Sequence, residues 1–442
     1  MIEPLPKSRL GDVLALGAGA LYPLAFAPFG YYFLAPISLA LLFYCWLAVR
    51  PRRALMRGYL FGLGAFAVGV SWIYISIATF GQVPVPLAVS LTSALVLFLA
   101  WFPALIGFAA IAMVPGMSAL TVRIKLALVF PSIWTLGEWV RGWIFTGFPW
   151  LNVGYSQTDG PLKGMAPVLG VYGVCFLVAL SAGLLVLIVM ERADSARLKS
   201  ALTLIGIWIV GAGSTLVQWT FPAGAPIRVA LAQGAIPQAI KWSPDMRDAT
   251  LDRYMILSRE HLDADLIIWP ETALPDFYHR QGDFLAEVAS LGRVSHTDFL
   301  IGTLYLDEET NFYYNSVVSI SGDEPAFYHK RHLVPFTEYL PLKTLLGSVV
   351  DFMRVPMSDF SSGDRHQGPI SAAGYPVAVS ICFEDAFGEE LITMLPAAKL
   401  LVNVSNDAWF GDSLAPHQHL QMARMRALET GRPMLRATNT GV

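Results

Sequence analysis

The sequence predicts two parts: a multi-span α-helical membrane domain over residues 1–219 and an α/β domain over residues 220–442. The chain of 442 residues is 55% apolar and only 14% charged, which is too apolar for an ordinary soluble protein. The charges are also unevenly distributed, because the first part carries 13 Lys and Arg against 6 Asp and Glu, and the second carries 17 against 27. The second part is long enough to bury a core of its own.

Seven apolar stretches precede residue 220, each close to the roughly 20 residues that a membrane-spanning helix needs. Gly and Pro interrupt several of them, which membrane helices tolerate when neighbouring helices satisfy the freed backbone groups. For the first stretch a cleaved signal peptide is the alternative, because Lys7 and Arg9 precede it and Ala25-Phe26-Ala27 has small residues at cleavage-site spacing. The expected spans lie near 10–28, 31–49, 57–79, 86–113, 123–143, 164–190 and 200–219.

The distribution of positive charge predicts how these spans are oriented. Eleven Lys and Arg residues fall before the first span and in the second, fourth and sixth connections, whereas the other connections carry only Arg141 and Lys163. The basic side faces the cytoplasm. Because seven is an odd number, we expect residues 220–442 on the periplasmic side of a bacterial inner membrane.

After residue 226 the pattern changes to short apolar strands that alternate with amphipathic helices. This alternation is typical of a layered α/β domain, in which ligands bind beyond the carboxyl ends of the strands. The expected strands lie near 228–233, 264–269, 298–306, 314–320, 375–382 and 399–404, and the expected helices lie near 245–263, 281–293, 387–396 and 416–430.

Three reactive side chains follow such strands: a carboxylate (Glu271), an amine (Lys330) and a thiol (Cys382). The carboxylate can accept the proton of the thiol, and the ammonium can stabilise negative charge on a carbonyl oxygen of a substrate. Each residue alone has a structural alternative, and a free cysteine often packs as a small apolar group. The other two cysteines lie inside apolar stretches, so no disulfide partner for Cys382 is evident. Their joint placement favours nucleophilic catalysis.

Three motifs carry a resemblance to a known family: Trp269-Pro-Glu271-Thr, His329-Lys330-Arg-His-Leu333 and Ile381-Cys382-Phe-Glu384-Asp. They resemble the Glu-Lys-Cys triad of the nitrilase (carbon-nitrogen hydrolase) superfamily. With the seven spans, Val334-Pro-Phe-Thr-Glu338-Tyr-Leu-Pro and Val404-Ser-Asn-Asp-Ala-Trp-Phe-Gly411, the whole chain resembles the apolipoprotein N-acyltransferases, membrane-anchored members of that superfamily.

The resemblance implies an α-β-β-α sandwich and a ping-pong acyl transfer. Glu271 would be the general base for Cys382, whose thiolate attacks the sn-1 ester of a phospholipid, typically phosphatidylethanolamine, to give a thioester. The N-terminal amine of a diacylglyceryl-cysteine on an apolipoprotein would then take the acyl chain. Lys330 and the backbone N–H of Phe383 would hold the oxyanion in both steps.

The resemblance also implies that Glu338, Phe383 and Glu384 support activity, although family members can carry Tyr at the position of Phe383. Such members continue beyond Thr438–Val442 into further strands and a last span, so we expect the sequence to be truncated. The implied partners are the phospholipid, the diacylated apolipoprotein and the membrane, and we expect a monomer. We expect no cofactor, and His417 and His419 lack a third ligand at metal-site spacing. No phosphate-binding glycine loop or nucleic-acid motif occurs.

Some features keep two interpretations. The loops that carry Trp242, Trp409 and Phe410 are either lids that open for lipid or packed surface loops. Glu138 and Arg141, three residues apart in the fifth expected span, are interpreted as a salt bridge rather than a functional pair. Tryptophans near its outer end are predicted to form an aromatic interface belt, with a border of lipid entry as the alternative; these are Trp139, Trp143 and Trp150.

Two other functions compete with acyl transfer. A membrane-tethered nitrilase-type amidase would use the same triad and release its acyl-enzyme to water. A non-catalytic lipid- or lipoprotein-binding protein would keep the fold without the chemistry, but the intact set of Glu271, Lys330 and Cys382 argues against it.

Overall fold

The computed structural model describes residues 9–322, 324–339 and 359–441, which form two compact units. The first unit comprises the chain up to Tyr74, Pro84–Trp219 and Ser413–Gly431, and the second comprises Ile75–Val83, Thr220–Asp412 and Arg432–Val442. The chain therefore crosses five times from one unit to the other. The contiguous division at residue 219 stays a prediction.

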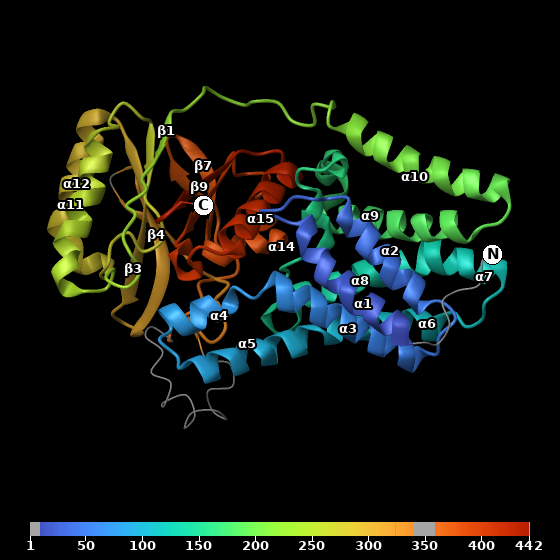
Figure 1. Ribbon diagram of the computed structural model, residues 1–442. Helices are drawn as coiled ribbons and strands as arrows, with labels where there is room; N and C mark the ends of the chain where they lie inside the picture. The colour runs from blue at the N-terminus through green and yellow to red at the C-terminus, as the bar shows by residue number, and fades with distance from the viewer. Residues whose placement is uncertain (1–8, 323, 340–358, 442) are drawn as a thin grey trace. The chain divides into compact units, whose positions relative to one another are not determined.

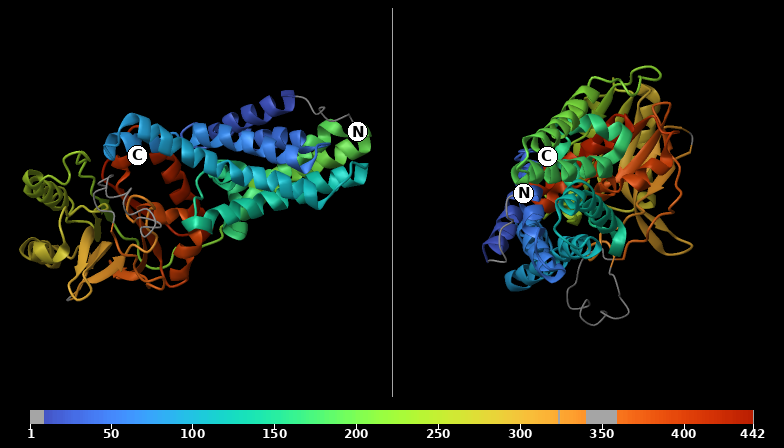
Figure 2. Two further views of the ribbon diagram at one scale, coloured as in Figure 1. Left: turned by 90° about the horizontal axis from the view of Figure 1, so that it is seen from below. Right: turned by 90° about the vertical axis from the view of Figure 1, so that its right-hand side faces the viewer.

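The first unit is a bundle of apolar helices (Figure 1). Helix α3 packs along α1 and α6, while α9 packs against α2, α8 and α10, and α10 lies beside α9 in each view (Figures 1 and 2). Glycines allow the closest approaches, since a Cβ at Gly183 would lie 1.8 Å from the carbonyl oxygen of Leu126. The helices of this unit are α1 (Arg9–Leu21), α2 (Leu34–Trp46), α3 (Pro51–Gly69), α4 (Ile73–Ile75, at the border), α5 (Val85–Leu99), α6 (Trp101–Met113), α7 (Ala119–Ile124), α8 (Phe130–Trp143), α9 (Ala166–Met190), α10 (Asp194–Ser214) and α15 (Leu414–Thr430).

Several of these helices are suited to cross a membrane. By length and composition four described helical segments qualify, namely Val85–Met113, Ala119–Thr146, Pro161–Met190 and Asp194–Ser214. A fifth is counted if Pro51–Gly69 and Ile73–Phe80, which meet at 56°, form one broken span. Helix α2 is apolar but only 13 residues long, and α1 has the same length. The total of seven spans stays a prediction.

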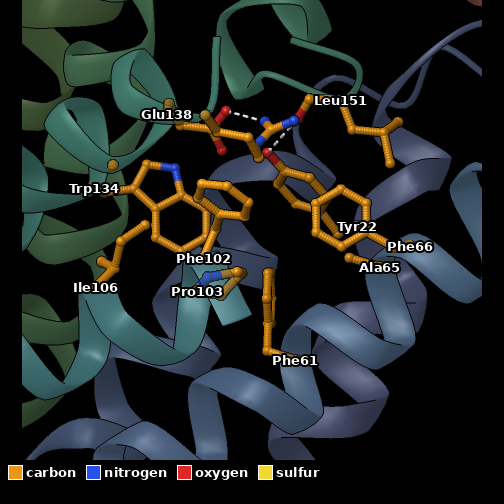
Figure 3. Close-up of a pocket in the computed structure, with 12 residues that line it drawn as sticks. Tyr22, Phe61, Ala65, Phe66, Phe102, Pro103, Ile106, Trp134, Glu138 and Leu151 are labelled. Carbon is orange, nitrogen blue, oxygen red and sulfur yellow. Dashed lines mark hydrogen bonds and ion pairs between the residues drawn. The ribbon is translucent and has the colours of Figure 1, made fainter. Parts of the chain in front are cut away.

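The predicted salt bridge between Glu138 and Arg141 is confirmed, and it is buried in the first unit. The Arg141 guanidinium also donates to the carbonyl oxygens of Phe148 and Trp150, so it holds the loop that follows α8. The ion pair lies in a pocket of this unit, and Figure 3 shows Glu138 beside the aromatic side chains that line this pocket. Three acceptors surround one guanidinium, which is the arrangement a buried cation requires.

Two of the three tryptophans predicted to form an aromatic belt are exposed, and the belt itself stays a prediction for them. Trp139 and Trp143 are 42% and 47% exposed, as residues at a membrane interface can be. Trp150 is only 2% exposed, and its indole N–H donates to Oε1 of Gln418 in α15 at 2.6 Å. The belt interpretation is therefore wrong for Trp150, because a packed helix from a distant part of the sequence covers it.

The second unit contains two mixed β-sheets. In the first, β1 (Val229–Leu231), β2 (Leu266–Ile268) and β3 (Asp298–Asp307) are parallel, and β4 (Phe312–Ile320) and β5 (Ala326–His329) continue it in antiparallel fashion. In the second, β6 (Ile370–Ala372) pairs antiparallel with β7 (Tyr375–Ile381), followed in parallel by β8 (Leu400–Ser405) and β9 (Met434–Thr438).

The two sheets pack face to face, because side chains from both form one apolar core. Ile268 and Val317 of the first sheet share this core with Val379 and Val402 of the second. Successive strand residues point to opposite faces, so Ile267 instead packs on the outer face of the first sheet.

Helices cover the outer faces. The first sheet is covered by α11 (Arg247–Arg259) and α12 (Gly282–Ser295), which lie on one side of the strands in Figures 1 and 2. The short helix α14 (Gly388–Leu391) packs on the second sheet through Leu391. The predicted α-β-β-α class is confirmed. The helix expected near 416–430 is present as α15, but it packs within the first unit.

The core between the sheets predicts a large effect of Ile268→Ala. Ile268 is 0% exposed, and truncation of such a side chain costs about 2–5 kcal/mol of stability. We expect a clearly lower melting temperature of the second unit by calorimetry in detergent. Leu231→Ala, at a β1 position that is 45% exposed, is the control and should cost less than about 1 kcal/mol. Equal melting temperatures for the two variants would contradict this core.

Candidate active site

Glu271 lies in the turn that follows β2, and both oxygens of its carboxylate are held. Oε1 accepts a hydrogen bond from Nδ2 of Asn315 at 2.7 Å, and Oε2 accepts one from the backbone N–H of Asn406 at 2.9 Å. The residue is 8% exposed. Because both oxygens accept hydrogen bonds, the orientation of this carboxylate is fixed, as a general base requires.

Lys330 follows β5 and is 1% exposed. Its Nζ donates to Oε1 of Glu338 at 2.8 Å and lies 3.8 Å from Oε1 of Glu271. Burial alone would lower the pKa of Lys330, but the charges of Glu338 and Glu271 outweigh burial and raise this pKa above its ordinary value. The ammonium therefore stays charged at any physiological pH.

Glu338 completes this charged cluster. Its Oε1 accepts from Lys330 and also from Nδ2 of Asn315, at 3.3 Å, and its Oε2 accepts from the backbone N–H of Val334 at 2.8 Å. The side chain of Asn315, which is 3% exposed, thus bridges two carboxylates. One ammonium and one amide hold both acids in place.

Cys382 directly follows β7 and begins a short 3₁₀ turn over Cys382–Ala386. Its φ of +53° is in the left-handed region, which is strained for a residue with a side chain. Nδ2 of Asn403 donates to the carbonyl oxygen of Cys382 at 3.0 Å and helps to hold this conformation. Such a strand-to-turn position presents a nucleophile at the end of a sheet.

Burial and the negative charge of Glu271 raise the pKa of the Cys382 thiol well above its usual value, although the Lys330 ammonium lowers it. The thiol is therefore protonated at neutral pH, and attack on a substrate requires a base. The same electrostatic coupling indicates that the three predicted triad residues form one site.

Glu384 fixes the chain around the thiol. Its Oε2 accepts from the backbone N–H of Ile381 at 2.7 Å and from the Tyr328 hydroxyl at 3.0 Å. Its Oε1 accepts from the backbone N–H groups of Arg331 and His332 at 2.8 and 3.1 Å. This carboxylate links the strand end before Cys382 to the segment after Lys330.

The remaining predicted residues lie on loops and turns. The Phe383 ring packs edge to face on Phe387, with ring centroids 4.9 Å apart. Trp242 is 37% exposed, whereas Trp409 and Phe410 are half-buried. The carbonyl oxygen of Trp409 accepts from the Ser76 hydroxyl at 2.9 Å. The oxyanion role of Phe383 and the lid role of the three aromatic residues stay predictions.

Sequence reasoning missed the asparagines and one lysine of this site: Asn315, Asn403, Asn406 and Lys241. Of these, only Asn403 carries a signal that could have been used, because it interrupts the apolar run of the strand expected near 399–404. His417 and His419 lie in α15, and no group of three or more His, Cys, Asp and Glu within 9–322, 324–339 and 359–441 is placed to hold a metal ion.

Both parts of the chain match known protein families. Residues 18–184 match the family described as "Apolipoprotein N-acyltransferase N-terminal domain", and residues 228–442 match "Carbon-nitrogen hydrolase". The chain is 50% identical over 434 residues to the "Apolipoprotein N-acyltransferase" of Methylococcus capsulatus, which covers 97% of this chain and 84% of that protein. It is 46% identical over 444 residues to the protein of the same name from Nitrosomonas europaea, with 98% and 86% covered.

Among solved structures, a carbon-nitrogen hydrolase from Helicobacter pylori aligns at 17% identity with a TM-score of 0.32, over 43% of this chain and 68% of that chain. This likeness is too weak to support a conclusion.

The role of Glu384 predicts that Glu384→Gln lowers both stability and activity. An amide cannot accept at both oxygen positions, so its NH2 group would face backbone N–H donors, at about 1–3 kcal/mol for each buried group left unsatisfied. Thermal melting and acyl-transfer assays should both show the defect. The neighbouring Glu389, which is exposed, gives the matched control Glu389→Gln, which should behave as wild type. A fully active Glu384→Gln variant would contradict this role.

The raised pKa of Cys382 predicts a pH dependence of its alkylation. Since burial raises the pKa of the thiol well above its usual value, the rate of reaction with iodoacetamide should keep rising through pH 9. Mass spectrometry of the peptide that contains Cys382 would measure this rate separately from Cys45 and Cys175. A plateau between about pH 6 and 8 would instead reveal a preformed thiolate.

Proposed function

Because this chain belongs to the apolipoprotein N-acyltransferase family, we propose that it transfers an acyl chain from a phospholipid to the N-terminal amine of an apolipoprotein. The observation that carries the proposal is the buried cluster of Glu271, Lys330 and Glu338, which acts electrostatically on the thiol of Cys382. A nucleophile, a base and a fixed positive charge are the groups that acyl transfer through a thioester requires.

In the first half-reaction, Glu271 accepts the proton of the Cys382 thiol as sulfur attacks the ester carbonyl carbon of the phospholipid. The tetrahedral intermediate collapses, the C–O bond breaks, and the alkoxide leaves with the proton that Glu271 returns. The products are a thioester on Cys382 and a lysophospholipid. The pKa of the thiol makes this coupled proton transfer necessary, since the thiolate is scarce at neutral pH.

In the second half-reaction, the α-amine of the lipoprotein's first residue attacks the thioester carbonyl carbon. A C–N bond forms while Glu271 takes the proton that the amine loses. The C–S bond then breaks, and Glu271 returns this proton to the leaving sulfur, which regenerates the thiol and the carboxylate. An amide is more stable than a thioester, so the transfer runs toward the acylated lipoprotein.

Negative charge develops on the carbonyl oxygen in both half-reactions. Lys330, held charged by Glu338, is the proposed stabiliser of this oxyanion, with the backbone N–H of Phe383 as its second donor. Phe383 supplies its N–H whatever its side chain, so the absence of a phenol hydroxyl leaves this part of the proposal intact.

The finer assignments are also part of the proposal. We place the reacting bond at the sn-1 ester of phosphatidylethanolamine and the accepting amine on a diacylglyceryl-cysteine. The protein would act as a monomer in the bacterial inner membrane, with its catalytic unit on the periplasmic side, as its excess of basic residues in alternate connections supports. Trp242, Trp409 and Phe410 would line the path by which lipids reach Cys382.

The proposal predicts an acyl adduct on the protein. Incubation with phospholipid vesicles that contain phosphatidylethanolamine should add one acyl mass, removable by hydroxylamine and located on Cys382 by peptide mapping. Cys382→Ala should carry no adduct, and Glu271→Gln should form it at least about 100-fold more slowly.

Discharge of that adduct separates acyl transfer from the amidase. A synthetic diacylated lipopeptide should remove the acyl group and gain its mass, while the adduct persists in buffer. Rapid loss to water with no acylated peptide would favour the amidase. A folded wild-type protein that forms no adduct would overturn both.

A further inference from the structure

A buried lysine outside the triad holds the turn that carries Glu271. Lys241, in the loop between β1 and α11, is 2% exposed. Its Nζ donates to the carbonyl oxygen of Glu271 at 3.1 Å and to the hydroxyl of Thr272 at 2.7 Å. Removing an ammonium from water is costly, so a lysine in this position calls for a specific explanation.

The turn that Lys241 holds is a constrained one. Thr272 has a φ of +48°, in the left-handed region that β-branched residues avoid. Strand β3 approaches the same turn closely, because a Cβ at Gly302 would lie 2.1 Å from the carbonyl oxygen of Pro270. A strained turn keeps its shape only when its surroundings fix it, and Lys241 supplies two of the fixing hydrogen bonds.

The loop of Lys241 also supports the other contact of the Glu271 carboxylate. The backbone N–H of Asn406 donates to Oε2 of Glu271, and Nδ2 of Asn406 donates to Oε1 of Gln238 at 2.8 Å. Asn439 ties the same loop to Asn406, since its Nδ2 donates to the carbonyl oxygen of Ile236 at 2.8 Å and to Oδ1 of Asn406 at 3.1 Å. The loop thus acts on both the backbone and the carboxylate of Glu271.

The pKa of Lys241 is consistent with its position beside Glu271. Burial lowers the pKa of Lys241 to about 8, and the negative charge of Glu271 opposes this decrease. Lys241 and Glu271 therefore interact electrostatically. The ammonium of Lys241 is present at neutral pH but is lost as the pH rises through about 8. The Trp242 ring, whose centroid is 5.8 Å from Nζ, is the adjoining part of the same loop.

We propose that Lys241 is a positioning residue for acyl transfer, which holds the Glu271–Thr272 turn so that the carboxylate is oriented toward the thiol. The role rests on the proposed function of Glu271 as the base. Lys241 also connects the loop of Trp242 to the turn of Glu271, so a movement of this loop would change the position of Glu271.

The first test compares Lys241→Met, which keeps the length of the side chain without its charge or donors, with Lys399→Met at an exposed lysine of the same unit. In rapid-quench assays with phosphatidylethanolamine vesicles, Lys241→Met should form the Cys382 adduct about 10- to 100-fold more slowly, the usual effect of a displaced catalytic group. KM for the lipid should change less than about twofold, because the lysine makes no contact with substrate in this proposal. Lys399→Met should match wild type.

The pH profile gives a readout that a purely structural role would not change. The ratio of the wild-type rate to the Lys241→Met rate should be constant below about pH 7 and fall as the pH rises through about 8, because wild type then loses its ammonium too. A ratio that stays constant across this range would exclude a role for the charge.

Alkylation of Cys382 by iodoacetamide at pH 7 tests the proposal without lipid. If Glu271 is displaced, its negative charge raises the pKa of the thiol less, so Lys241→Met should speed this reaction severalfold. Absence of a lipid adduct in wild type would overturn the proposed function, whereas equal adduct and alkylation rates in wild type and Lys241→Met would overturn the role of Lys241 alone.

Should Lys241→Met fail to fold, the partner hydroxyl provides a milder variant. Thr272→Val removes the acceptor of Nζ while keeping the shape, and Thr272→Ser keeps the acceptor. We expect a slower adduct formation in Thr272→Val only, by about 3- to 10-fold, which is less than the full loss of a hydrogen bond to a charged group because Nζ keeps the carbonyl oxygen of Glu271 as acceptor. Equal rates in the two variants would count against the proposal.

Discussion

The charged cluster of the second unit depends on the buried ammonium of Lys330. Lys330 lies between Glu271 and Glu338, and without it these two carboxylates would share a nearly dry site without the ion pairs that it makes with both of them. Mutual repulsion and desolvation would then drive protons onto these acids, and a protonated Glu271 could not accept the proton of a thiol. The ammonium therefore does two things at once: it permits the acids to be buried, and it keeps the proposed base in its ionised form.

The reacting groups come from different sheets, which makes the apolar core part of the chemistry. Glu271 and Lys330 follow strands of the five-stranded sheet, whereas Cys382 follows a strand of the four-stranded sheet. Their relative placement thus depends on the side chains that pack between the sheets, in addition to the loop contacts of each residue. Rigid strands hold such a constellation more accurately than loops do.

The sequence allowed the fold class and the three triad positions to be predicted, because strand ends are visible as polar residues that interrupt apolar runs. It gave no comparable signal for Asn315, which lies within a strand and resembles any polar strand residue. Asn406 contacts Glu271 through its backbone N–H, and the residue type does not predict a backbone contact. A lysine in a polar loop is usually solvated, so the burial of Lys241 could not be foreseen. Trp150 contacts Gln418 of α15 across 268 positions of sequence, and local sequence patterns cannot predict a contact at that separation.

The interleaved path of the chain limits how this protein can be divided. A polypeptide confined to residues 220–442 would lack Ile75–Val83, which belongs to the second unit, and would carry α15 without the α9 surface on which it packs. The buried face of α15, with Met422, Ala423 and Met425, would then meet water. Proteases that cut at one unit boundary would likewise leave the other crossings intact. A contiguous piece such as residues 220–442 therefore corresponds to neither unit, and a cut that respects both units has to be made at several points of the chain.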